Sequence, residues 1–188
     1  MRRRLFFRYL LAGVLSAPLA RAANAHTPYR QWKILRQRFL LVHSSRTDPV
    51  SDDIAEGIVD ILDRVLPKAN AMVARAPDEA RIASLITTGQ AVLAVMRADR
   101  AVELYQRSGA FGDFEGGQLR TLVAIGDHLL VTVAAFPRHH AWLVTAALVE
   151  NGNELGVRLP DEAAGSRSVP LHEGAAGFSR GESLEVQE

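Results

Sequence analysis

The chain has 188 residues, a formal net charge of +1, 23% charged residues and 48% hydrophobic residues. These values are those of an ordinary soluble globular protein of one domain, and they exclude a polybasic nucleic-acid binder. The chain has no cysteine, which excludes disulfides and any zinc, iron–sulfur or thiol chemistry that uses cysteine. Its stability must therefore come from apolar burial.

The amino terminus predicts an export signal over residues 1–25. Three arginines precede an apolar run, and small-residue triplets follow it, which is the layout of a cleavable secretory signal. The run falls short of the ~20 residues that a membrane span needs. Residues 3–8, RRLFFR, resemble the twin-arginine export signal, and a general secretory signal rich in arginine is the alternative. We expect cleavage near Ala22 or Ala25 and a periplasmic mature protein.

Residues 26–151 predict an α/β lobe in which strands and helices alternate. A β-rich run at 38–44 leads to Asp48 and Pro49, a helix cap and first helical residue, and Pro67 ends the helix. The alternation predicts a mostly parallel sheet with flanking helices and right-handed crossovers. The remaining elements are expected as strands at 70–75, 92–96, 119–125 and 129–134, helices at 77–89, 99–106 and 139–151, and a loop at 107–117.

The carboxyl-terminal part, residues 152–188, predicts a flexible tail. It is rich in Gly, Ser, Glu and Arg and has few large apolar residues, a composition typical of disordered segments. The sequence VPLHEG, residues 169–174, is the one stretch of the tail that looks ordered, and we expect residues 169–175 to pack back on the lobe.

The loop HSSRTDPVS, residues 43–51, is the first candidate for ligand binding. It lies between a strand and a helix, and ligands of open α/β sheets bind where such loops meet helix N-termini. Hydroxyls of Ser44, Ser45 and Thr47, the cation of Arg46 and free backbone N–H groups suit a carboxylate or another small oxyanion. The alternative interpretation is that Ser, Thr and Asp only cap the helix. Arginines end the next two strands and can clamp an anion, or can be solvated surface residues.

No pattern in the sequence predicts an enzyme, a metal site or a cofactor. There is no Gly-x-Ser-x-Gly elbow and no glycine-rich phosphate loop between a strand and a helix. His139 and His140 are adjacent on a predicted helix and point about 100° apart, so they do not chelate one metal easily. We therefore expect a non-enzymatic protein that has neither a metal nor a cofactor.

Several stretches together resemble a known family, the TAXI-type periplasmic solute-binding proteins of TRAP transporters. The resemblance covers most of residues 38–178, and PLHEGA is its most specific part, similar to the closing segment of that family. The sequence departs from the family in one respect: members have two α/β lobes that clamp the ligand, and here the second lobe is missing. The matching stretches are 81–95 (RIASLITTGQAVLAV), Leu119-Arg120, 140–142 (HAW), 147–150 (ALVE) and 170–175 (PLHEGA).

The resemblance implies an exported protein that binds a small organic anion for transport or sensing, with a membrane transporter as its partner. Because one lobe cannot enclose a ligand, most of the buried surface of a pocket would be lost. By position, the ligand-facing loops of the family correspond to Ser44, Ser45, Arg46 and Thr47, to Arg75 and Ala76, and to Arg97 through Asp99.

The alternative is an interaction module that docks on another exported protein. The missing lobe would leave a bared face, and a large exposed apolar face usually marks a partner. Phe111 and Phe114, three residues apart and flanked by glycines, are either anchors on a mobile loop or plugs at the edge of the core. Neither hypothesis involves nucleic acid.

Overall fold

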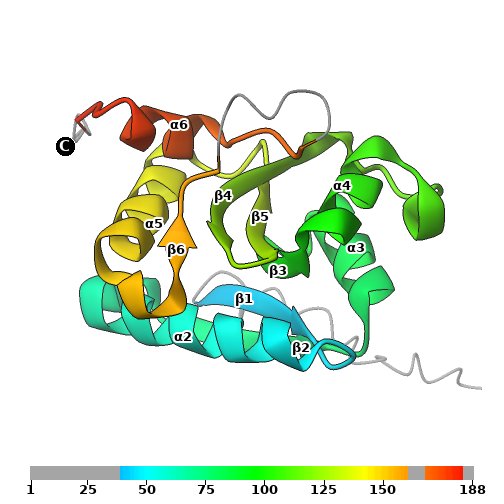
Figure 1. The fold of residues 1–188 in the computed structure, drawn as a ribbon, viewed down its shortest axis with the longest axis horizontal. Coiled ribbons are helices and arrows are strands. Elements are labelled where there is room, and N and C mark those ends of the chain that lie inside the picture. The colour runs from blue at the N-terminus through cyan, green and yellow to red at the C-terminus, as the bar shows by residue number, and fades with distance from the viewer. Residues whose placement is uncertain (1–38, 161–167, 184–188) are drawn as a thin grey trace, which may run out of the picture.

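The structure, a computed structural model, describes residues 39–160 and 168–183. A central sheet is covered by helices on both faces (Figure 1). The strands of these residues are β1 (Leu40–Ser45), β2 (Ala71–Ala76), β3 (Leu93–Arg97), β4 (Leu119–Ile125), β5 (His128–Val133) and β6 (Val157–Arg158). The α-helices are α2 (Pro49–Val65), α3 (Glu79–Thr87), α4 (Ala98–Gln106), α5 (Arg138–Asn151) and α6 (Glu173–Ser179). Short 3₁₀ turns are η1 (Pro67–Ala69), η2 (Gly109–Phe111), η3 (Gly116–Gln118) and η4 (Asn153–Leu155).

The sheet has the strand order β2-β1-β3-β5-β4-β6. β1 pairs in parallel with both β2 and β3, whereas β5 runs antiparallel to both β3 and β4. β4 therefore points the same way as β1, β2 and β3, and the reversed β5 lies between them. β6 is antiparallel to β4. The predicted α/β class is confirmed, with a mixed sheet whose core is mostly parallel.

The first strand and helix form as the sequence predicts. β1 has five consecutive buried residues after its first, because both faces of a central strand are covered. Asp48 is the N-cap of α2, its side chain accepts a hydrogen bond from the Ser51 N–H, and Pro49 is the first helical residue. Ile54, Ile58 and Leu62 lie on one buried stripe of α2, which fixes the face that this helix turns to the sheet.

The core has two parts, one on each face of the sheet. α2 and α5 cover one face through Ile58 and Leu148, and α3 and α4 cover the other through Ile82 and Leu104. Phe111, from the predicted loop at 107–117, is 1% exposed and belongs to the second part. Its ring packs edge-to-face on Phe114 with the centroids 5.9 Å apart. Of the two roles proposed for these phenylalanines, Phe111 has that of a core plug.

The described parts of the tail contain regular elements, although the composition predicts a flexible segment. β6 pairs with β4, and α6 packs against α5 (Figure 1). Small residues make this packing close, since a Cβ on Gly174 would lie 2.2 Å from the carbonyl oxygen of Arg138. Ala175 is fully buried. Composition does not reveal such order, because it comes from the close approach of small side chains and not from large apolar ones.

The predicted export signal at residues 1–25 lies outside the described residues. Within residues 39–160 and 168–183, no helix has the length and apolar character required to cross a membrane.

Two buried threonines allow a test of what a hydrogen bond to a buried hydroxyl contributes to stability. The Thr145 hydroxyl on α5 has no hydrogen-bond partner among the described residues, whereas the equally buried Thr121 hydroxyl donates to the Val169 carbonyl at 3.3 Å. Thr145→Val should therefore raise the free energy of unfolding by about 1 kcal/mol, and Thr121→Val should lower it by about the same amount. Chemical denaturation of both variants checks this, and equal losses would mean that the Thr145 hydroxyl is in fact paired.

Candidate functional site

The candidate site lies where the parallel strands end. β1 leads through α2 to β2 on one side of it, and the chain then returns through α3 to β3 on the other side of β1. The helix that follows β1 and the helix that follows β3 cover opposite faces of the sheet, so the gap between the ends of these two strands is a topological switch point. Ligands of open α/β sheets bind at such a point, outside the carboxyl ends of the strands. The residues predicted from the sequence lie at this edge. The register pairs Ser44 with Arg75 and Ser45 with Ala76.

The hydroxyls of the loop after β1 are used within the loop and at the start of α2. The Ser44 hydroxyl donates to the Asp52 carboxylate at 2.7 Å, and the Ser45 and Thr47 hydroxyls bond to each other at 2.8 Å. The Ser51 hydroxyl accepts from the Ser45 N–H at 3.0 Å and donates to the Asp48 carbonyl at 2.7 Å. Ser44 and Ser45 are buried, so these two residues hold the shape of the loop. Thr47 is exposed beside them.

Asp48 and His128 form a contact that the sequence did not predict. Nε2 of His128 lies 2.8 Å from Oδ2 of Asp48, and the side chains are 8% and 15% exposed. Oδ1 of Asp48 caps α2 by accepting from the Ser51 N–H at 3.3 Å. His128 reaches this edge because β5 is reversed, so that its first residue pairs with Arg97, the last residue of β3. The sequence signal that could have placed His128 here is the short Gly126-Asp127 turn between two predicted strands, where Gly126 has a positive φ of 54°.

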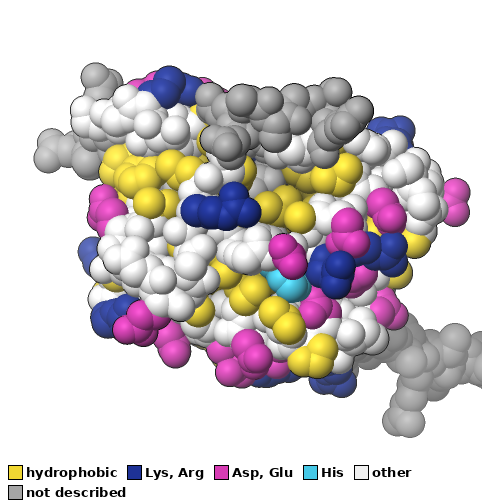
Figure 2. Space-filling view, viewed as in Figure 1, with side chains coloured by type: hydrophobic (Ala, Val, Ile, Leu, Met, Phe, Trp, Pro, Cys, Tyr) yellow, Lys and Arg dark blue, Asp and Glu magenta, His cyan; other side chains and the backbone are white. Residues whose placement is uncertain are grey.

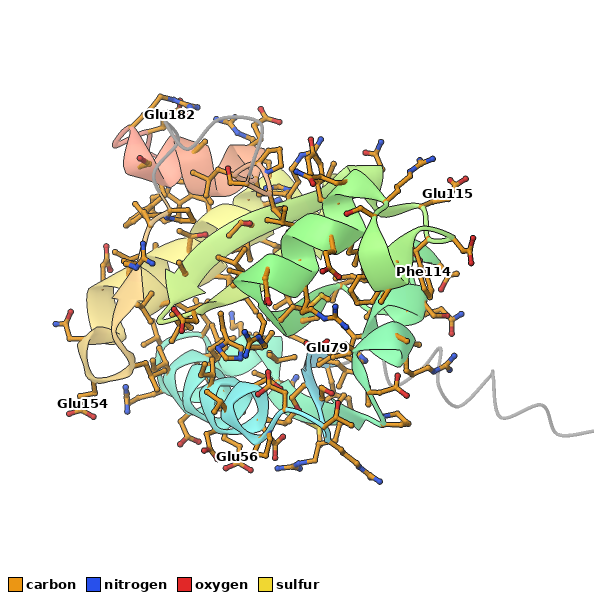
Figure 3. The ribbon with its side chains drawn as sticks, turned by 45° about the vertical axis from the view of Figure 1, so that its right-hand side comes forward. Glu56, Glu79, Phe114, Glu115, Glu154 and Glu182 are labelled. Atoms are coloured by element: carbon orange, nitrogen blue, oxygen red, sulfur yellow. The ribbon has the colours of Figure 1, made fainter. Side chains whose placement is uncertain are left out.

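Most arginines at this edge are neutralised by carboxylates of the chain itself. Arg75 pairs with Asp52 at 2.9 Å and also with Glu56, which lies on the outward side of α2 (Figure 3). Hydrogen bonds from Ser44 and then from Arg75 hold the pKa of Asp52 below its ordinary value. The hydrogen bond to Asp52 in turn raises the pKa of Arg75. Arg75 is thus already engaged where the sequence suggested an anion clamp.

The arginines that follow β3 are engaged in the same way. Arg97 pairs with Asp99 at 3.2 Å, and a hydrogen bond from Arg97 is the main cause of the lowered pKa of Asp99. Arg100 pairs with Glu79 at 3.0 Å and with Glu103 at 2.7 Å. Figure 2 shows such mixed acidic and basic side chains around a histidine near the place where β3 ends in Figure 1.

Arg46 differs from these arginines. Its side chain makes no ion pair or hydrogen bond within residues 39–160 and 168–183, and it is exposed. Its backbone N–H donates to the carbonyl of the buried Ala76 at 2.9 Å, which fixes the base of the side chain to the end of β2. After the hydrogen bonds from Ser44 and Arg75, the charge of Arg46 also contributes to the lowered pKa of Asp52.

The histidines do not assemble into a metal centre in the part of the chain that the structure describes, where no group of three or more His, Asp or Glu side chains has suitable geometry. The rings of His139 and His140 lie with their centroids 3.9 Å apart and their planes tilted by 49°. Burial, and next the neighbouring His139, lower the pKa of His140. These two histidines lie at the start of α5, which follows the carboxyl end of the reversed β5. They are therefore at the opposite edge of the sheet from the candidate site.

No protein-family model matches the chain, and no curated protein matches it significantly.

Proposed function

We propose that this protein is an exported, one-lobed relative of the TAXI-type solute-binding proteins, and that it recognises a small organic anion for transport or sensing. We place the binding site at Arg46 because of one observation. Of the arginines at the carboxyl edge, Arg46 is the one without a carboxylate partner among the described residues, whereas Arg75, Arg97 and Arg100 are all paired. An exposed guanidinium with its five donors free is the group best suited to a carboxylate.

The surroundings of Arg46 support a carboxylate of small size. Thr47, next to it, exposes its side chain, and the Thr47 hydroxyl is oriented by the buried Ser45 hydroxyl. The N-terminus of α2 is already occupied by Asp48, so the helix dipole offers little to a second anion. Recognition therefore rests on the Arg46 cation and the adjacent hydroxyl.

The docking alternative has less support from the geometry. Phe111 is in the core and is not available as an anchor. The edge that a second lobe would have covered carries charged side chains, including Arg46, Arg75 and Arg97, and not an apolar face. In the described ranges, the exposed large apolar residues are Val50, Val65 and Met72, which lie at the two ends of α2 and on β2.

Arg46→Ala is expected to abolish stabilisation by the ligand. A ligand at 100 times its Kd adds about 2.7 kcal/mol of stability and raises the midpoint of thermal unfolding by several degrees. The measurement is thermal unfolding of the purified protein alone and with millimolar amino acids, dicarboxylates and other small carboxylates. Without ligand, Arg46→Ala should unfold close to the wild-type temperature, because the side chain makes no ion pair or hydrogen bond among the described residues. With ligand, it should show no shift.

Arg64→Ala is the matched control. Arg64 is also exposed but lies in the last turn of α2, far along the helix from the site, so its loss changes the net charge equally. It should keep the full shift. The proposed site would be contradicted if ligand still raised the unfolding midpoint of Arg46→Ala. It would also be contradicted if both variants lost the ligand-induced shift equally, because the change in net charge would then explain the loss.

A further inference from the structure

Residues 168–183, called here the C-terminal strap, are held on β4 by the sequence VPLH. The Thr121 N–H donates to the Pro170 carbonyl, and the His172 N–H donates to the Thr121 carbonyl, each at 2.8 Å. Leu171 thereby forms a parallel bridge with Thr121. The strap covers the edge of β4 at this point, and β6 covers it further along, at Ala124 and Ile125.

The rest of the strap lies on α5. Trp142 packs edge-to-face on Phe178 with ring centroids 5.4 Å apart, and its indole N–H donates to the Glu182 carbonyl at 2.9 Å. Arg138, in the first turn of α5, pairs with Glu173 at 3.5 Å and with Glu182. Figure 3 shows Glu182 at the far end of α6. The first turn of α5 has no acidic residue of its own, and the strap brings two carboxylates to it through Arg138.

His172 lies at the junction between the two halves of the strap. It is 2% exposed, and its Nδ1 accepts a hydrogen bond from the Gly174 N–H at 3.0 Å, which caps α6. A nitrogen that accepts this bond carries no proton, so the neutral ring must hold its proton on Nε2. Nε2 is buried and makes no hydrogen bond of acceptable geometry with the described residues. A protonated ring would turn Nδ1 into a donor facing the Gly174 N–H, and the docked geometry excludes it.

Some of the groups around His172 lower its pKa, and others raise it. Burial is the largest effect and lowers the pKa of His172 below its ordinary value of 6.5. Arg120 on β4 lowers it further, while the carbonyls of Phe136 and Ala134, before α5, and Glu173 on the strap raise it. On α5, the His140 ring packs on Phe136, and Arg138 is ion-paired with Glu173. The net result is a ring that resists protonation while the strap is docked.

We propose that the C-terminal strap is a pH-sensitive latch, docked on β4 and α5 while His172 is neutral and released when His172 is protonated. In the released strap, His172 titrates near its ordinary pKa, because burial no longer acts on it. The strap is fully docked above that pH. As the pH falls below it, toward the lowered pKa of the docked state, the docking equilibrium constant falls by up to about tenfold per pH unit. Release frees the backbone groups of Thr121 at the edge of β4, where another extended segment can pair.

Trp142 reports directly on this latch. Of the two tryptophans in the chain, Trp142 contacts the strap, and Trp32→Phe in the full chain leaves it as the sole emitter. The experiment titrates Trp142 fluorescence from pH 8 to pH 4, with circular dichroism in the far ultraviolet as a measure of global folding. We expect a red shift below pH 6.5 while most of the circular dichroism signal is retained.

His172→Asn is the variant that tests the mechanism, because asparagine also caps a helix but does not titrate. Its Trp142 emission should be independent of pH over the range in which the wild type responds. His140→Asn controls for the second histidine near this junction and should keep the wild-type response. A transition that persists in His172→Asn, or a red shift that coincides with loss of the circular dichroism signal in the wild type, would overturn the latch.

Discussion

Gly116→Ala is expected to lower the free energy of unfolding by about 3 kcal/mol, one of the larger effects of a single methyl group in this chain. A Cβ on Gly116 would lie 1.8 Å from the carbonyl oxygen of Leu104 and 2.5 Å from its carbonyl carbon. Both are backbone atoms, so no side-chain rotation relieves the clash. Leu104 is fully buried on α4, and η3 would have to move away from that helix.

Gly117→Ala is the matched control, because it adds the same methyl group one residue later. The nearest atom to a Cβ on Gly117 is a guanidinium nitrogen of Arg107 at 4.0 Å, an ordinary contact. This variant should change stability by less than about 0.5 kcal/mol. Urea denaturation monitored by circular dichroism measures both free energies. Equal stability of the two variants would show that η3 does not approach α4 as closely as the structure has it.

The elements of the fold were predictable because their signals are local. Asp48 followed by Pro49 marks the start of α2, and the spacing of Ile54, Ile58 and Leu62 marks its buried face. Each signal lies within one element and does not depend on its neighbours in space. The hairpin turn at 126–128 is equally local, but the reversal of β5 between β3 and β4 depends on the whole sheet.

The position of the candidate site was predictable from the sequence, but which of its arginines are paired with carboxylates was not. The carboxyl ends of β1 and β3 follow from the alternation of strands and helices, and the polar residues there are visible in the sequence. Which arginine remains without a carboxylate depends on residues of another element, such as Asp52 for Arg75. The contact between Asp48 and His128 joins residues 80 positions apart, and no spacing in the sequence reveals it.

The helix in the strap was the hardest feature to predict, since the sequence predicts that residues 169–175 pack back on the lobe but does not predict α6. Gly174, Ala175 and Ala176 have the composition of a linker, yet all three are buried in the structure. They are buried because α6 approaches α5 too closely for larger side chains, and that approach depends on Arg138 and Trp142 of α5. Small residues at a helix contact and small residues in a linker have the same composition, so hydropathy does not distinguish them.

Asp48→Ala is expected to lower the free energy of unfolding by about 2–4 kcal/mol, the sum of two losses. The first is the cap on α2, where Oδ1 accepts from the Ser51 N–H, which contributes about 1 kcal/mol. The second is the hydrogen bond to His128, whose ring is 8% exposed and would be left without this partner. A buried polar group that loses its partner costs about 1–3 kcal/mol.

Asp48→Asn is the control that shows whether the loss comes from the cap and the His128 hydrogen bond or from any substitution at this position. Asparagine caps helices as well as aspartate does, and its amide can still bond to the imidazole, so the loss should stay below about 1 kcal/mol. A double-mutant cycle with His128→Ala should give a coupling energy of about 1–3 kcal/mol, measured by urea denaturation. A coupling energy near zero would mean that Asp48 stabilises the protein only as a helix cap, and that His128 does not fasten the β4–β5 hairpin to the start of α2.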